Sequence, residues 1–200
     1  AYESETDEPF PQDAGTQLAE VLRSMARAWD GTTARLLRQA KGAPPDAGLG
    51  LVVQAMALGV GRGESGSGVI QFVDAQTGEP RLVGRYLGQS QGREALTTAR
   101  GASYLTRDPR GPSLEEAAPA AFAELVEAGT RIRTRLKEEM QIEFTLENGR
   151  LRILDAVRVP RAARAALRVA VALAEDGIID RAEAVMRVDP AALPALLHRQ

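Results

Sequence analysis

Apolar residues recur at helical spacing in the first part of the chain. From residue 12 onward they lie three and four positions apart, at Leu18, Val21, Leu22, Met25 and Trp29. This pattern predicts an amphipathic helix with a buried stripe and with Asp13 or Thr16 as its N-cap. A second short helix is predicted over Thr32–Lys41, where the buried positions are Leu36 and Leu37.

The apolar pattern then changes from helical to extended. Leu49–Gly59 is a continuous apolar run bounded by glycines, which predicts a strand buried on both faces, although its periodicity also allows a short buried helix. A glycine-rich loop follows over Gly59–Gly68. Val69–Val73 and Arg81–Leu87 are predicted to form an antiparallel pair, because the turn between them contains the strong breakers Asp74, Gly78 and Pro80.

The second half of the chain combines a helix and a hairpin. Ser113 and Glu116 have the spacing of a capping box, so a helix is predicted over Leu114–Met140 with the apolar stripe Phe122, Leu125, Val126, Ile132 and Leu136. Gly129 is a point at which this helix could bend or break. The next segment, Gln141–Val157, is predicted to be a hairpin around Asn148-Gly149.

The C-terminal part has the pattern of short helices. An Ala-rich helix begins near Pro160, and two more are predicted over Asp180–Val188 and Pro190–His198. Together these elements predict an α+β fold, in which an antiparallel sheet is packed by helices and followed by a helical C-terminal extension. The predicted divisions are a flexible acidic lead-in over 1–11, a lobe over 12–158 and a helical extension or linker over 159–200.

Composition excludes several classes of function. A 200-residue chain with 44% hydrophobic residues can form a core, and a net charge of −2 argues against nucleic acid as a partner. The absence of cysteine and the single histidine, His198, exclude a Cys- or His-based metal cluster and a Ser-His-Asp triad within one chain. No apolar run reaches the roughly 18 residues of a membrane span, and the acidic start is unlike a secretory signal. We therefore expect a cytoplasmic protein that does not bind membranes.

The hairpin carries the acids with the clearest chemical potential. Glu143 and Asp155 lie on its two strands, and carboxylate pairs can bind magnesium. With a regular type I′ turn, Ile142, Phe144, Leu146, Leu151 and Ile153 would form the buried face, and Glu143 the other face with Thr145, Glu147, Arg150 and Arg152. Asp155 would then point away from Glu143 unless a bulge redirects one strand. Alternatively, Glu143 is a solvated strand residue and Asp155 ends its strand.

Three further sets of residues allow both a purely structural and a functional interpretation. Gly61–Gly66 fits the G-x-G-x-x-G string but lacks the following helix of a dinucleotide fold, so it is predicted to be a hairpin loop, which could still cover a phosphate. Gln54, Ala55 and Met56 are either core residues or the edge that holds an adenine. A charged cluster could line a cleft or form surface ion pairs, and it consists of Arg85, Arg93, Glu94 and Arg100.

Several ordered motifs resemble one known family. VVQAMALG is similar to V-x-V-Q-A-M-x-x-G, SGSGV and DAQTGE to S-G-T-G-V and N-P-A-T-G-E, and GRYLGQSQGRE to G-E-x-L-x-x-A-Q-G-E-D. QIEFTLENGRLRILDAVR is similar to D-I-E-F-T-I-E-x-G-K-L-x-x-L-Q-T-R, and EDGIIDRAEAVMRVDPAALPALLH to the linker helices that follow. From about Phe10 to His198 the chain therefore resembles the second ATP-grasp lobe of the pyruvate phosphate dikinase family.

The resemblance implies specific roles. Gln54, Ala55, Met56 and Glu94 would contact the nucleotide, and Glu143 and Asp155 would be ligands of a magnesium ion bound with ATP. Asp155 replaces a glutamine of the family motif and suits a hard cation. Other replacements change the charge of the implied site: Arg85 and Arg93 stand in place of acids, Gln141 in place of an aspartate, and Val157 in place of an arginine.

The resemblance also limits what the chain is expected to do. The family's first ATP-grasp lobe, phosphohistidine domain and pyruvate-binding barrel have no counterpart in these residues. We therefore expect an ATP-binding lobe that cannot catalyse phosphoryl transfer by itself and that needs a first lobe or another protein chain. The alternative is a degenerate, non-catalytic lobe that acts as a protein-interaction or regulatory module and self-associates.

Overall fold

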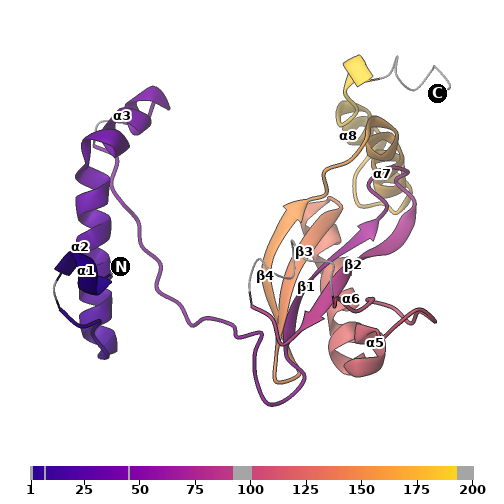
Figure 1. The fold of residues 1–200 in the computed structure, drawn as a ribbon. Coiled ribbons are helices and arrows are strands. Elements are labelled where there is room, and N and C mark those ends of the chain that lie inside the picture. Colours follow the sequence, from indigo (N-terminus) through magenta and orange to yellow (C-terminus); the bar gives the residue numbers. More distant parts are fainter. Residues whose placement is uncertain (1, 7, 45, 92–100, 193–200) are drawn as a thin grey trace. The chain divides into compact units, whose positions relative to one another are not determined.

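A computed structural model describes residues 2–6, 8–44, 46–91 and 101–192 of the protein. The chain forms two compact units, Ala1–Ala55 and Met56–Gln200 (Figure 1). This division differs in position from the boundaries at residues 11 and 158 that we proposed from the sequence, and those boundaries stay a proposal. Each unit is described by itself.

The first unit is helical. It contains α1 (Tyr2–Thr6), which lies in the predicted lead-in, α2 (Ala14–Asp30) and α3 (Thr32–Ala40). Asp13 caps α2 as predicted, because its side chain accepts a hydrogen bond from the Thr16 backbone N–H. Both predicted helices are therefore present, and their bounds differ from the prediction by one or two residues.

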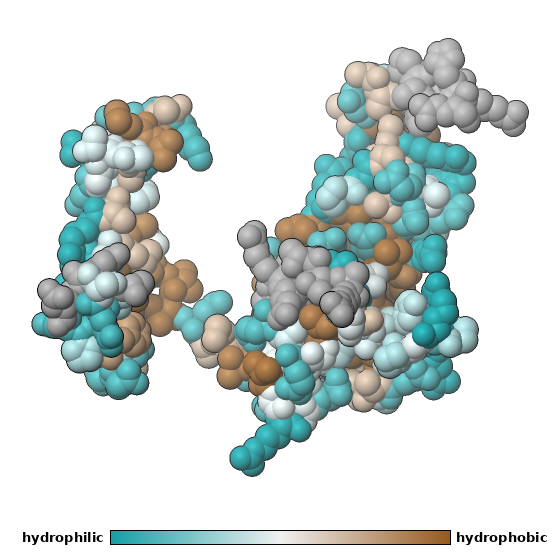
Figure 2. Space-filling view, in the orientation of Figure 1, coloured by the Kyte–Doolittle hydropathy of each residue, from teal (hydrophilic) through white to brown (hydrophobic). Residues whose placement is uncertain are grey.

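The predicted burial of these helices is wrong. None of the residues described in the first unit is buried, and Leu36 and Leu37 of α3 are 60% and 58% exposed. Apolar atoms are accordingly visible on the surface of this unit (Figure 2). The amphipathic pattern is real, but among the described residues of this unit it encloses no core.

The predicted strand over Leu49–Gly59 is also wrong. Residues 49–58 have no regular secondary structure, and all but Ala57 are exposed, with Val52 at 82% and Met56 at 70%. A strand needs a neighbour that satisfies its backbone N–H and C=O groups. Within the described residues, no strand pairs with this segment.

The second unit contains a four-stranded antiparallel sheet, which confirms the predicted α+β class. The strands are β1 (Gly66–Val73), β2 (Pro80–Gly88), β3 (Met140–Glu147) and β4 (Arg150–Arg158), in the order β2-β1-β3-β4. The two predicted hairpins are thus correct, and β1 and β3 form the centre of the sheet. Asn148 and Gly149 have φ values of 51° and 79°, as a type I′ turn requires.

One face of the sheet is covered by helices. Ser113 is the N-cap of α5 (Leu114–Ala117), as predicted: its Oγ accepts from the Glu116 backbone N–H and donates to the Glu116 side chain. After Ala118 the chain continues as α6 (Pro119–Leu136), so the single helix predicted over Leu114–Met140 is interrupted at Ala118 and ends four residues early. Gly129 does not interrupt α6. A Cβ there would lie 2.1 Å from the Phe72 ring, so the glycine allows helix and sheet to approach closely. The core between them contains Ile70, Leu114, Leu125, Ile142, Phe144 and Leu146.

A smaller cluster lies at one end of the sheet. It is formed by α7 (Ala163–Glu175) and α8 (Arg181–Met186), which pack near the end of β1 (Figure 1). Asp180 caps α8, as predicted, and a single 3-10 turn follows at η1 (Pro190–Ala192). The cluster includes Val73, Val159, Val169, Ala170, Leu173 and Ile179. In the described part of the chain, no helix is long and apolar enough to cross a membrane.

Candidate functional site

The sheet face opposite α6 carries a row of charged side chains. Glu143 on β3 is the cross-strand partner of Val69 on one side and of Asp155 on the other, and Val69 is also the partner of Arg85 on β2. Directly opposite residues of an antiparallel pair have their Cβ atoms about 5 Å apart on the same face. The four strands therefore present Arg85, Val69, Glu143 and Asp155 side by side.

A β-bulge places the two acids directly opposite each other in the sheet. Phe144 pairs with Ile153 and Glu143 pairs with Asp155, so Leu154 is an extra residue on β4. The bulge changes the phase of β4, and Leu151 and Ala156 consequently both pack against the core despite their odd separation. The regular register, which would have placed Asp155 away from Glu143, is therefore wrong. The bulge that their convergence required is present.

The buried face also differs from the regular prediction. Ile142, Phe144 and Leu146 are fully buried, as predicted, whereas Ile153 on the edge strand β4 is 39% exposed. Thr145, predicted on the polar face, is buried because the segments at Gly59 and Ser90 cover that end of the sheet. Its Oγ1 lies 3.1 Å from Ser67 Oγ, which donates to the Ser90 carbonyl.

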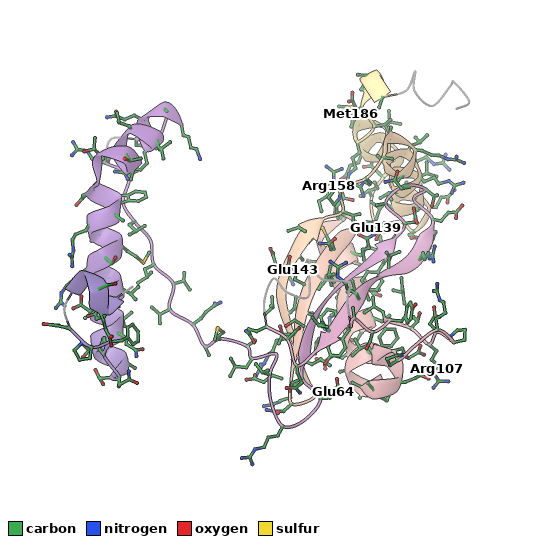
Figure 3. The ribbon with its side chains drawn as sticks, viewed as in Figure 1. Glu64, Arg107, Glu139, Glu143, Arg158 and Met186 are labelled. Carbon is green, nitrogen blue, oxygen red and sulfur yellow. The ribbon has the colours of Figure 1, made fainter. Side chains whose placement is uncertain are left out.

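A shallow pocket lies beside the charged row. It has a volume of about 290 Å³ and is lined by Val69, Gln71, Val83, Gly84, Arg85, Gln141 and Glu143. Figure 3 labels Glu143 beside the strands of the sheet. The lining combines one guanidinium, one carboxylate and two carboxamides above an apolar floor. We did not predict Gln71, although it lies two residues from Val69 and therefore shares its face.

The acid pair fits a divalent cation that shares its ligands with phosphate. Magnesium is commonly held by one or two carboxylates together with waters and phosphate oxygens. Among the residues that the structure describes, no group of three or more His, Cys, Asp or Glu side chains could hold a metal ion. Glu143 and Asp155 alone would therefore need a bound phosphate to complete the coordination.

The glycine-rich loop before β1 is attached to its neighbours by its own N–H groups. Those of Gly59, Gly61 and Gly63 donate to side-chain oxygens, in order, of Gln91, Gln89 and Asn148. The segment is a loop, as predicted, but it is not a hairpin loop, because residues 49–58 before it form no strand. Three of its N–H groups are engaged within the protein. It lies at the end of the sheet marked by Glu64 in Figure 3.

Tyr86 links the same loop to the core through a hydrogen bond. Its hydroxyl donates to Glu64 Oε1 at 2.8 Å, and its ring, 2% exposed, is stacked on Phe144. Burial, followed by the hydrogen bond and the nearby charge of Glu64, raises the pKa of Tyr86 far above its usual value. The glycine-rich loop is thus coupled to the centre of the sheet.

The other predicted site residues either precede β1 in the chain or lie outside the described residues. Gln54 and Ala55 belong to the first unit and Met56 to the second, and all three are exposed. Their assignment to adenine stays a prediction. Glu94, together with Arg93, Arg100 and His198, lies outside the described residues.

The chain is similar in sequence to known pyruvate, phosphate dikinases. The chain is 36% identical over 196 residues to a pyruvate, phosphate dikinase of Rhizobium meliloti (strain 1021), and the match covers 95% of the chain. It is 31% identical to the pyruvate, phosphate dikinase of Clostridium symbiosum and 31% identical to pyruvate, phosphate dikinase 2 of Oryza sativa subsp. japonica, over 98% and 100% of the chain. The chain spans 22% of the length of each relative. No family model matches it.

The opposed acids predict a local cost to stability. Like charges directly opposite one another in a sheet are destabilising, so Asp155→Asn should raise the free energy of unfolding by about 0.5 kcal/mol when divalent cations are chelated. Urea unfolding with and without EDTA measures this change. The gain should shrink in 1 M salt, where charges on an exposed face are screened. A lower stability of the variant under chelation would contradict the arrangement.

Tyr86 predicts a stability change at alkaline pH. The unfolded chain loses this phenolic proton near pH 10 and the folded chain loses it later, so the contribution of Tyr86 is complete below pH 10 and is lost as pH rises further. Unfolding free energies measured from pH 8 to 11 should fall above pH 10 by up to about 1.4 kcal/mol per unit from this group. Tyr86→Phe should remove that part of the slope. An unchanged slope in the variant would be inconsistent with the buried phenol.

Proposed function

Because the chain is a homologue of one segment of pyruvate, phosphate dikinases, we propose that it is an ATP-grasp-like lobe that binds ATP with magnesium. The observation that carries this proposal is the bulge at Leu154, which sets Glu143 and Asp155 opposite each other on the sheet face that α6 does not cover. Two directly opposed acids destabilise a hairpin that has only a structural role, whereas a magnesium-phosphate site can use both as ligands.

The side chains of the pocket suggest how the lobe would hold the phosphates. Glu143 and Asp155 would hold the magnesium ion, which neutralises phosphate charge when bound. Gln71 and Gln141 can donate hydrogen bonds to phosphate oxygens from their amide groups. Val69 is 9% exposed and provides a largely dry floor, where hydrogen bonds to charge are stronger than in water.

We propose that the lobe does not transfer a phosphoryl group by itself. Transfer requires positioned cations around the phosphates, and Val157 stands where the resembled motif has an arginine. In the part of the chain that the structure describes, α6 packs on the opposite face of the sheet and no helix packs on the charged face, so a second lobe or chain would have to cover the phosphates and exclude water. We also propose that the chain functions in the cytoplasm and that a protein partner covers the bound phosphates.

Binding of MgATP should stabilise the protein measurably. At a free MgATP concentration ten times the dissociation constant, the free energy of unfolding should rise by about 1.4 kcal/mol. The double variant Glu143→Gln, Asp155→Asn should lose most of this gain because the magnesium ligands are removed. Isothermal titration calorimetry, together with urea unfolding at several MgATP concentrations, measures both effects.

A matched control separates this effect from a general change of charge. Glu127→Gln removes an exposed, ion-paired carboxylate from α6, on the other side of the sheet, and should leave MgATP binding unchanged. Absence of heat with wild-type protein at millimolar MgATP would refute the proposed nucleotide binding.

A second candidate function is favoured by the first unit. Its helices carry apolar stripes, yet none of its described residues is buried, and residues 49–58 add further exposed apolar side chains. Isolated helices of this length are marginally stable without tertiary packing. We therefore propose, as the alternative, a non-catalytic module whose N-terminal helices bind protein, including a second copy of the chain.

This alternative predicts self-association through α3. Wild-type protein should sediment as a dimer or larger species at high micromolar concentrations, and Leu36→Ser with Leu37→Ser should shift it toward monomer because apolar contact area is lost. Val185→Ser with Met186→Ser removes comparably exposed apolar side chains from α8 and serves as the control. A wild-type monomer across the concentration range would count against the module, as would tight binding of MgATP.

A further inference from the structure

Arg85 is the cationic end of the charged row across the sheet. It lies on β2, with Val69 of β1 between it and Glu143 of β3, while Asp155 follows on β4. Neighbouring strands are about 4.8 Å apart, so the backbones of Arg85 and Glu143 are separated by about 10 Å. This spacing leaves room for a small group above Val69 while both charged side chains can reach it.

Arg85 and Glu143 also line the same pocket. The remaining lining is neutral, with carboxamides from Gln71 and Gln141 and apolar surface from Val69. Arg85 is itself partly buried, which strengthens its interaction with an anion compared with a fully exposed side chain. Arginine also presents a planar fork of donors that matches two phosphate oxygens.

The charges of the row select the kind of ligand. Two carboxylates and one guanidinium sum to −1, so the acids oppose a bare anion and Arg85 opposes a bare divalent cation. A phosphate that carries its own magnesium satisfies both ends of the row at once. Resting on the proposed function, we infer that Arg85 is the phosphate-binding residue of this site and that it makes the site selective for a magnesium-bound phosphate group.

Titration calorimetry tests this inference. The whole chain is titrated with three probes: MgATP, Mg²⁺ alone and adenosine. Arg85→Ala should weaken MgATP binding by about tenfold or more, because a charge-assisted hydrogen bond is lost, and should leave adenosine binding unchanged. The same variant should bind Mg²⁺ alone about threefold more tightly, since a like charge is removed about 10 Å from the acids. If Arg85 only stabilised the fold, Arg85→Ala would not weaken the binding of MgATP while strengthening the binding of Mg²⁺ alone.

Two further variants sharpen the result. Arg85→Lys keeps the charge but not the fork of donors, and should bind MgATP with an affinity between those of wild type and Arg85→Ala. Arg81→Ala removes the same charge from the same strand at an exposed residue that does not line the pocket, and should change MgATP affinity by less than about twofold.

The outcomes distinguish this inference from the proposed function. Wild-type affinity for MgATP in Arg85→Ala, alongside loss of binding in the Glu143→Gln, Asp155→Asn variant, would overturn the role of Arg85 and leave nucleotide binding intact. Parallel loss of MgATP and adenosine binding in Arg85→Ala would also overturn it. Failure of wild-type protein to bind MgATP would refute both proposals.

Discussion

The pairing of β3 with β1 on one side and β4 on the other is the constraint on which the second unit depends. Side chains alternate along β3, so Phe144 is buried against the helices while its neighbour Glu143 faces the other side of the sheet. Core and candidate site are therefore one residue apart on the same strand. A slip of β3 by one residue would place a carboxylate in the core and an aromatic ring in the site.

Glycines allow this pairing to form a compact sheet. A Cβ at Gly68 would lie 2.5 Å from the Phe144 ring, and one at Gly84 would lie 2.0 Å from the Val69 carbonyl oxygen. The glycine at 68 leaves room for the large core side chain, and the one at 84 adopts a φ of 153° that other residues rarely adopt. Close packing around β1 thus supports the floor of the pocket at Val69.

The two units differ in how far they bury their apolar side chains. In the second unit, sheet and helices bury a continuous set of apolar side chains from four strands and α6. In the first unit, the same kind of amphipathic pattern has no opposing layer among the described residues. An apolar stripe shows only that a helix has a face that can be buried. The surface that covers this face has to come from another part of the chain or from another molecule.

The sequence by itself determined those features that depend on near neighbours. The caps at Asp13, Ser113 and Asp180 and the turn at Asn148-Gly149 were predictable because side chain and backbone interact within a few residues. The antiparallel hairpins followed from these turns and from alternating apolar residues, and the ordered motifs identified the similarity to pyruvate, phosphate dikinases.

Only the tertiary structure decided which residues meet across the sheet and which find a partner. The bulge at Leu154 allows both Leu151 and Ala156 to pack against the core, and this core comes from residues far apart in the chain, so no local signal revealed that Asp155 faces Glu143. The proximity of Arg85 to that row depends on the pairing of β1 with β3, which are some 70 residues apart in the chain. Residues 49–58 have the composition of a buried strand but remain exposed, because burial requires a neighbouring strand that a segment's own residues cannot supply.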